Sequence, residues 1–274
     1  AVCNVLEEAK RRNQPVVVHC KTVKGLGYAP AEQRPNVFHG VSAFDVETGK
    51  PLKAKEMDFS AAFGASLCQL AEENKRICAI TAAMSEGTGL SEYADRFRDR
   101  FFDVGIAEEH AVTFAAGLAA GGMTPVVAVY SSFLQRAYDQ IVHDVCIQNL
   151  HVVFAIDRAG LVGSDGETHQ GIFDLSYLSS IPNMHVMAPK NKWELSDMLK
   201  FALGLNAPVA IRYPRGEAYA GLEEFRAPIE YGKSEVLYEE SQVALFAVGS
   251  MVKIAEAVLE DLKIAGIQAS LVNA

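Results

Sequence analysis

Three residues that can exchange protons, Glu108, Glu109 and His110, follow one another near the middle of the chain. They come shortly after the apolar segment 101–104, so we expect them where a strand passes into a helix. Carboxylates and an imidazole at such a place can act as general acids and bases. Glutamates are also typical of a helix start, where they face the positive end of the helix dipole. The spacing alone leaves both interpretations open.

Aromatic and basic residues gather after the next apolar segment. Tyr130, Phe133 and Arg136 are spaced by three residues, which places them on one face of a helix. Such a face could stack on a ligand ring and hold a negative charge. The alternative is that the two aromatic side chains belong to the core and the arginine is solvated. Both readings remain open from the pattern.

A glycine-rich segment, 157–171, carries three further polar candidates: Arg158, Asp165 and His169. It follows a predicted strand, and ligands of open α/β sheets lie beyond the carboxyl ends of the strands. Arg212 and Arg215 lie at the end of another predicted strand. A guanidinium group there suits a phosphate or a carboxylate. A lone histidine is more often structural, although this loop favours a functional one.

The overall composition narrows the class of partner. Acidic residues outnumber basic ones by 34 to 25, giving a formal net charge of −9, and no basic cluster appears. Nucleic-acid binding is therefore disfavoured, and small metabolites are the expected partners. There is no GxGxxG sequence after a strand, no Walker A loop and no HExxH motif. A nicotinamide-dependent or P-loop enzyme is therefore disfavoured as well.

Cysteine usage and hydropathy bear on the compartment. The five cysteines are scattered and never spaced as CxxC, which argues against a disulfide framework or a structural zinc site and fits a reducing cytoplasm. Residues 111–135 carry no formal charge, but Gly121-Gly122 and Pro125 interrupt them. We interpret this stretch as a buried helix, turn and strand rather than a membrane span.

The elements that must position these residues follow a regular order. Apolar segments recur at intervals of about 24 to 33 residues, with helical patterns between most of them. Strands separated by helices at this spacing indicate βαβ units and hence a parallel sheet flanked by helices. The predicted strands begin near residues 77, 101, 126, 152, 185 and 209, and the predicted helices span 108–120, 133–149 and 192–205.

The two ends of the chain predict incomplete domains. The N-terminal residues have a helical pattern followed by a predicted strand at 15–20, and the C-terminal part predicts a strand, a helix and a strand at 243–248, 252–265 and 267–272. Strands without neighbours cannot satisfy their backbone groups, so we expect a piece of a longer polypeptide. The irregular segments 25–55 and 215–233 read as linkers, the first also as a loop over a site.

Seven motifs of the chain are distinctive when taken together: KGLGYAPAE (24–32), FHGV (38–41), TAAMSEGTGL (81–90), FFDVGIAEEHAVTFAAGLA (101–119), YSSFLQRAYDQIVHDV (130–145), DRAGLVGSDGETHQG (157–171) and IRYPRG (211–216). With these motifs the chain resembles a known family, the 1-deoxy-D-xylulose-5-phosphate synthases. The fifth and sixth motifs above all separate it from transketolases and pyruvate dehydrogenase β subunits.

The resemblance implies a thiamine-diphosphate enzyme that condenses pyruvate with D-glyceraldehyde 3-phosphate and releases CO2. Its product feeds isoprenoid, thiamine and pyridoxal synthesis. The resemblance divides the chain into the end of a diphosphate-binding domain (1–50), a pyrimidine-binding domain (51–225) and the start of a third domain (226–274). The GDG-type motif for Mg²⁺ is absent, so the metal ligands are expected outside this chain. A cytoplasmic homodimer is implied.

The resemblance also assigns the cofactor contacts. Glu108 is expected to hydrogen-bond the ring nitrogen of the aminopyrimidine, and Phe133 to stack on that ring. Met84 and Ile106 would shape the bound conformation of the cofactor. Lys24 and Tyr28 would be cofactor contacts from the first domain.

For the acceptor substrate, the resemblance implies a basic pocket. Arg136, Arg158 and Arg215 would surround the phosphate of glyceraldehyde 3-phosphate, which forked guanidinium groups suit. The residues expected to meet hydroxyl groups and pass protons are Tyr130, Asp165, His39 and His169, and which histidine moves the key proton stays open. Two alternatives are a transketolase or keto-acid relative, and a folded fragment that is inactive alone.

Overall fold

The structure is a computed structural model that describes residues 1–35, 37–41, 43–52 and 57–274. The chain divides into two units, residues 1–54 and 55–274, and each is described here by itself. The first unit is small and contains the helices α1 (Val2–Arg11) and α2 (Ala29–Gln33). The second unit contains both sheets of the structure and all the remaining helices.

The first unit differs from its prediction at one element. No strand forms at residues 15–20, where the backbone has no regular structure. A strand requires a hydrogen-bonded neighbour, and none of the described residues pairs with this segment, so its run of valines alone was a misleading signal. The segment around α2 is held by three aromatic side chains: Phe38 lies edge-on to both Tyr28 and Phe44.

A parallel sheet of six strands forms the centre of the second unit, as predicted. Its strand order is β2-β1-β3-β4-β6-β5, and every neighbouring pair is parallel. The strands begin within two residues of the predicted positions. They are β1 (Ile77–Thr81), β2 (Phe101–Asp103), β3 (Thr124–Tyr130), β4 (Val153–Asp157), β5 (His185–Met187) and β6 (Val209–Arg212).

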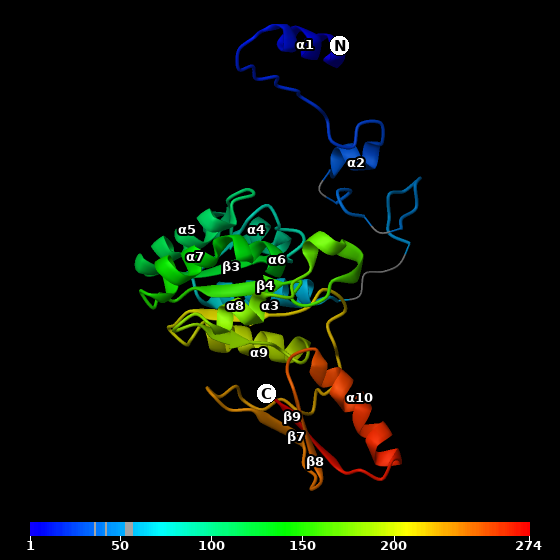
Figure 1. Cartoon of the computed structure of the whole chain (residues 1–274), viewed down its shortest axis with the longest axis vertical. Helices are drawn as coiled ribbons and strands as arrows, with labels where there is room; N and C mark the ends of the chain where they lie inside the picture. Colours follow the sequence, from blue (N-terminus) through cyan, green and yellow to red (C-terminus); the bar gives the residue numbers. More distant parts are fainter. Residues whose placement is uncertain (36, 42, 53–56) are drawn as a thin grey trace. The chain divides into compact units, whose positions relative to one another are not determined.

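Helices cover both faces of this sheet (Figure 1). One face packs against α3 (Phe59–Glu73), α4 (Ser91–Arg96) and α9 (Lys192–Ala202). The other face packs against α5 (Glu108–Ala120), the helical segment 131–146 and α8 (Asp174–Ser179). Because neighbouring strand side chains point to opposite faces, β3 places Val126 in the first core and Val127 in the second.

The helix predicted at 133–149 forms as a series of short turns. The segment consists of α6 (Ser131–Leu134), a 3₁₀ turn (Gln135–Ala137), α7 (Tyr138–Gln140) and a π-helical turn (Ile141–Cys146). The apolar pattern identifies the buried side of a helix, but it does not distinguish among hydrogen-bond periods. By contrast, α5 spans the predicted residues 108–120.

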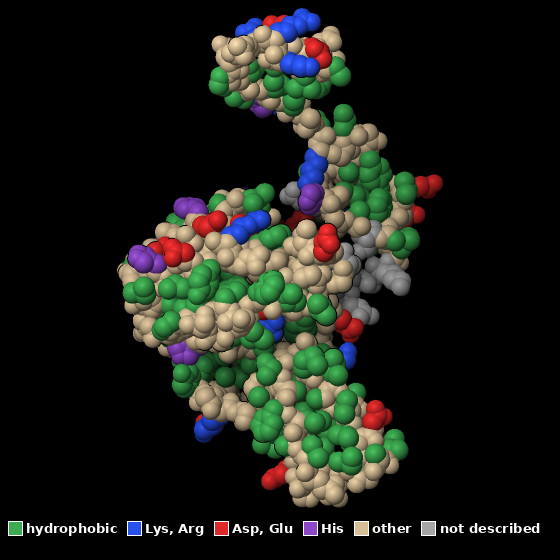
Figure 2. All heavy atoms as spheres, viewed as in Figure 1, with side chains coloured by type: hydrophobic (Ala, Val, Ile, Leu, Met, Phe, Trp, Pro, Cys, Tyr) green, Lys and Arg blue, Asp and Glu red, His purple; other side chains and the backbone are tan. Residues whose placement is uncertain are grey.

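A second sheet of three strands lies at the C-terminal end of the chain. Its strands are β7 (Glu235–Tyr238), β8 (Val243–Ala247) and β9 (Ala269–Asn273), in the order β7-β9-β8, and α10 (Met251–Ile264) connects β8 to β9. The predicted strand, helix and strand are confirmed, whereas β7 was not predicted. Hydrophobic side chains gather over this part of the surface (Figure 2), and those of α10 include Met251 and Ile254. No helix in the described part of the chain is long and apolar enough to cross a membrane.

A buried polar cluster joins the second sheet to α9. The ammonium group of Lys190, whose side chain is 2% exposed, donates to Glu194 at 2.9 Å and to Glu235 of β7 at 2.7 Å. The amide of Asn273, the last residue of β9, donates to the Glu194 carboxylate at 2.7 Å. Buried charges need partners, so this cluster fixes the second sheet against the first residues of α9.

We expect Lys190→Met to destabilise the second unit strongly, because it leaves two carboxylates without their shared cation. Removing one partner of a buried ion pair costs about 3–5 kcal/mol of unfolding free energy. Urea denaturation of the full-length protein that carries this sequence measures the loss. The matched control is Lys233→Met, since Lys233 pairs with Glu230 on the surface. Equal unfolding free energies of the two variants would contradict a stabilising role for the ion pairs of Lys190 with Glu194 and Glu235.

Candidate active site

The candidate site lies at the carboxyl ends of the central strands. Tyr130 ends β3 and Asp157 ends β4, and the two residues are paired in the sheet register. Arg158 follows Asp157 directly, and Arg215 lies three residues beyond the end of β6. Because parallel strands end at the same edge, three segments that are distant in the sequence meet here.

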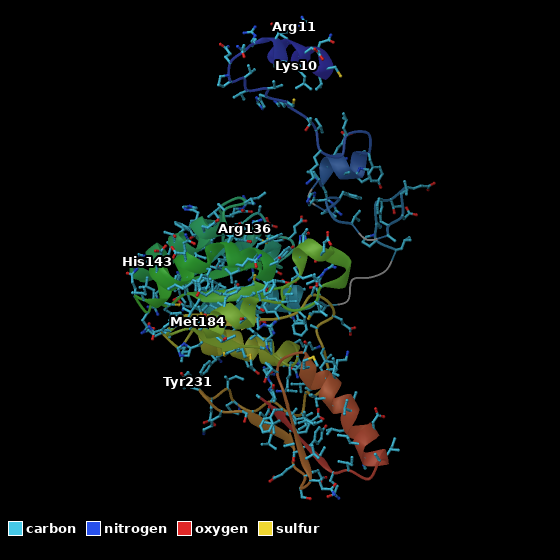
Figure 3. All side chains as sticks on the ribbon, in the orientation of Figure 1. Lys10, Arg11, Arg136, His143, Met184 and Tyr231 are labelled. Carbon is cyan, nitrogen blue, oxygen red and sulfur yellow. The ribbon has the colours of Figure 1, made fainter. Side chains whose placement is uncertain are left out.

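Glu108 is the first residue of α5 and its carboxylate is buried, with 2% of the side chain exposed. Arg136 donates to this carboxylate from its Nη1 atom at 2.8 Å. The Arg136 guanidinium also lies over the Phe133 ring, 4.9 Å from its centre, and remains half exposed. Arg136 and His143 belong to one helical segment but lie at separate places on this layer (Figure 3). The helical face that carries Phe133 and Arg136, predicted from their spacing, therefore contacts Glu108 at the start of α5.

Three rings form the centre of the cluster. The Tyr130 and Phe133 rings are stacked, with centres 5.8 Å apart and planes 24° apart. The His169 ring lies edge-on to Phe133 at 5.1 Å and tilted to Tyr130 at 6.2 Å. Burial raises the pKa of the Tyr130 hydroxyl above its usual value, so the phenol stays protonated at neutral pH.

Two arginines share one carboxylate on the other side of these rings. The Arg158 guanidinium lies over the Tyr130 ring, 3.9 Å from its centre, and its Nε is 3.4 Å from the Asp165 carboxylate. Arg215 forms an ion pair with the other oxygen of Asp165, with its Nη1 atom 2.8 Å away. A continuous set of contacts thus connects Glu108 to Arg215 through the rings. The members are Glu108, Arg136, Phe133, His169, Tyr130, Arg158, Asp165 and Arg215.

The loop that carries Asp165 and His169 is closed by its own backbone. Gly160 and Gly171 exchange two hydrogen bonds, of 2.6 and 2.8 Å, in an antiparallel bridge. A Cβ atom at Gly171 would overlap the carbonyl of Arg158 and the side chain of Ser131. The close approach therefore requires glycine at this position, and it holds the loop against β4 and α6.

Asp157 belongs to the site although the sequence patterns did not single it out. Its side chain is fully buried, accepts from the Ser60 hydroxyl of α3 at 2.6 Å, and accepts from Arg158 Nη1 at 2.8 Å. Burial raises the pKa of Asp157 to about 6, against the opposing effects of Arg158 and Ser60. The only signal in the sequence was an acidic residue at the end of an otherwise apolar strand.

The remaining predicted residues occupy three different places. Met84 is buried in the second core, and Ile106, in the loop before α5, is 81% exposed. Arg212 does not join the two arginines around Asp165; its guanidinium donates to Asp174 of α8 at 2.8 and 3.3 Å. The others belong to the first unit, which is described by itself: Lys24 and His39 are exposed, and Tyr28 donates to the Val46 carbonyl.

The residues of the cluster fit a flat nitrogen heterocycle better than a metal ion. A buried carboxylate and an aromatic ring, those of Glu108 and Phe133, are suited to a ring with one polar edge. Among the described residues, no group of three or more His, Cys, Asp or Glu side chains could hold a metal ion.

Comparison with known proteins gives a consistent assignment. The family model "Transketolase, pyrimidine binding domain" matches residues 55–220. The 1-deoxy-D-xylulose-5-phosphate synthase of Lachnoclostridium phytofermentans is 57% identical over 270 residues, and that of Clostridium tetani is 54% identical over 270 residues. Each match covers 98% of this chain but only 43% and 44% of the relative. The chain thus spans less than half the length of the curated relatives it matches.

Solved structures agree on the fold. A split-gene transketolase, described as an inactive β4 tetramer, is 32% identical with a TM-score of 0.70, and the match covers 80% of this chain and 71% of that one. The transketolase of Pichia stipitis solved with sedoheptulose 7-phosphate has a TM-score of 0.71 at 18% identity. The match covers 80% of this chain and 35% of that one, and at this identity it supports the fold alone. The chain therefore belongs to the transketolase pyrimidine-binding domain family, and over 98% of its length it is similar to curated 1-deoxy-D-xylulose-5-phosphate synthases.

Proposed function

We propose that the protein condenses pyruvate with D-glyceraldehyde 3-phosphate to 1-deoxy-D-xylulose 5-phosphate and CO2, with thiamine diphosphate as cofactor. The reaction supplies isoprenoid, thiamine and pyridoxal synthesis in this proposal. The observation that carries it is the connected cluster from the buried Glu108 carboxylate to the Arg158–Asp165–Arg215 group. One end suits the pyrimidine ring and the other suits a phosphate. The names of the curated relatives support the same reaction.

On the cofactor side, Glu108 is the residue to which we assign the catalytic proton. A buried carboxylate at the start of α5 can hold a proton against a ring nitrogen, because little water competes for the hydrogen bond. Phe133 offers an aromatic face for stacking, and Met84 and Ile106 offer apolar contacts. We extend the proposal to Lys24 and Tyr28 as cofactor contacts from the first unit. When bound, the cofactor supplies the carbanion chemistry.

On the acceptor side, Arg136, Arg158 and Arg215 bind the aldehyde phosphate in this proposal. Each of the three guanidinium groups is paired with a carboxylate of the described chain. A phosphate dianion can replace part of these contacts with forked, charge-assisted hydrogen bonds. The groups assigned to the substrate hydroxyls and to proton transfer are Tyr130, Asp165, His169 and His39; the first three lie in the cluster, and His39 belongs to the first unit.

Several further parts of the proposal rest on the family resemblance. We propose that Mg²⁺ holds the diphosphate through ligands outside this chain, and that the enzyme is a homodimer. We assign residues 1–50, 51–225 and 226–274 to the end of the diphosphate-binding domain, the pyrimidine-binding domain and the start of the third domain. A cytoplasmic location is consistent with the five cysteines, all of which are free thiols.

The function is tested by measuring CO2 release from pyruvate by the full-length protein with thiamine diphosphate and Mg²⁺. We expect rapid release that depends on glyceraldehyde 3-phosphate, with one five-carbon deoxyketose phosphate formed per CO2. The transketolase-type structure with 32% identity makes two-carbon transfer from a ketose the second candidate. Transfer from xylulose 5-phosphate without CO2 release would reject the synthase and establish that alternative.

We expect Glu108→Gln to lower kcat by at least about a hundredfold, since general acid–base groups contribute about 10²–10⁴ in rate. Glutamine keeps the shape of the side chain and can still accept from Arg136, so the Kd for thiamine diphosphate changes little. Steady-state kinetics and calorimetric titration of the full-length protein measure the two quantities.

The matched control is Glu109→Gln, because Glu109 is the neighbouring acid on the same helical turn and is exposed. Its kcat is expected to remain close to that of the parent. Turnover of Glu108→Gln at the parent rate would remove Glu108 from the proposed catalytic role.

A further inference from the structure

Asp157 differs from the other carboxylates of the cluster in that both it and its arginine partner are largely buried, with 0% and 12% of their side chains exposed. Glu108 pairs with a half-exposed arginine, and Asp165 lies in a surface loop. Asp157 is the last residue of β4, beneath the rings, and its two oxygens accept from Ser60 and Arg158. A charged group at such a place carries a desolvation cost that must be offset by its partners. The partner on the site side is the Arg158 guanidinium.

The position of Arg158 is fixed from several sides. Its backbone is in the left-handed region, with φ of 58°, which a side-chain-bearing residue adopts only when its surroundings hold it there. The Nη1 atom donates to the Gly87 carbonyl at 2.6 Å as well as to Asp157 at 2.8 Å. Gly87 lies so close to the Tyr130 hydroxyl that no Cβ fits between them. The guanidinium is thus held over the Tyr130 ring, 3.9 Å from its centre, with its Nε 3.4 Å from Asp165.

The two carboxylates that pair with Arg158, those of Asp157 and Asp165, differ in whether a ligand from solvent can displace them. Asp165 is partly exposed and shared with Arg215, so an incoming phosphate can displace it from either guanidinium. Asp157 is covered on every side and cannot be displaced by a ligand from solvent. With its pKa of about 6, it is ionised at neutral pH and keeps its hold on Nη1.

We propose that Asp157 is a positioning residue: its buried carboxylate fixes the Arg158 guanidinium so that the remaining N–H groups face the phosphate of the aldehyde substrate. This inference rests on the proposed function. It assigns the discrimination between phosphorylated and unphosphorylated acceptors to a side chain that touches neither of them. Ser60, 97 residues away in the sequence, orients the carboxylate in turn.

The test compares kcat/KM for D-glyceraldehyde 3-phosphate with kcat/KM for D-glyceraldehyde in the full-length protein. Asp157→Asn keeps the side-chain shape but removes the charge. We expect the ratio of the two values to fall by about tenfold or more, since hydrogen bonds to charged groups are worth about 1.5–3 kcal/mol. The KM for pyruvate is expected to stay close to that of the parent. A role in folding alone would lower both values together.

The matched control is Asp174→Asn. Asp174 is also buried and also holds an arginine at the edge of the same sheet, but that arginine, Arg212, makes its contacts with Asp174 and not with Asp165. Asp174→Asn is expected to lower the free energy of unfolding and to leave the ratio of the two kcat/KM values unchanged. If Asp157→Asn does not fold, Ser60→Ala decides, with an expected fall in the ratio of about fivefold for one hydrogen bond.

An unchanged ratio in both Asp157→Asn and Ser60→Ala would overturn the inference. Arg158→Ala separates this outcome from a failure of the proposed function. If Arg158→Ala lowers the ratio while the other two variants do not, the synthase assignment stands and only the positioning role is wrong. If the parent shows no aldehyde-dependent CO2 release, the proposed function itself is wrong.

Discussion

The arrangement of the site depends on one constraint: a buried carboxylate must have a positively charged or hydrogen-bonding partner. Glu108 begins a helix whose next buried residues are apolar, and its charge is offset by the Arg136 guanidinium at 2.8 Å. Arg136 in turn rests on the Phe133 ring, which stacks on Tyr130. An unpaired charge at Glu108 would cost several kcal/mol, so the ion pair also fixes the rings. The same constraint repeats at Asp157, where Arg158 is the partner.

Charge pairing gives the cluster a state that is both stable and ready to bind an anion. Arg136, Arg158 and Arg215 are balanced by Glu108, Asp157 and Asp165 in the structure. In the proposed function, a phosphate exchanges with the partly exposed Asp165 carboxylate without leaving a guanidinium uncompensated. The buried carboxylates would remain in place and keep the directions of the donors. The proposal thus assigns phosphate exchange to the exposed acid of the network and positioning to the buried acids.

Sequence periodicity predicted the sheet because each βαβ unit imposes its own spacing, and the predicted strand starts fall within two residues of those observed. It also predicted the candidate residues at strand ends, where Tyr130, Arg158 and Arg215 meet. The failures have physical causes. The strand at 15–20 has the right residue types but no hydrogen-bonding neighbour. The three apolar residues of β7 lie between charged residues, so no apolar segment marks this strand in the sequence. Asp157 was missed because its role depends on Ser60, which only the tertiary structure brings near.

The central claim is that this chain supplies the pyrimidine end and the phosphate end of a single active site. A crystal structure of the full-length protein with thiamine diphosphate and glyceraldehyde 3-phosphate tests it most directly. We predict a Glu108 carboxylate oxygen at about 2.6–3.2 Å from a pyrimidine ring nitrogen, the range of a hydrogen bond that transfers a proton. The substrate phosphate would lie against Arg158 and Arg215. A pyrimidine ring bound without contact to Glu108, or a phosphate bound away from both arginines, would contradict the account.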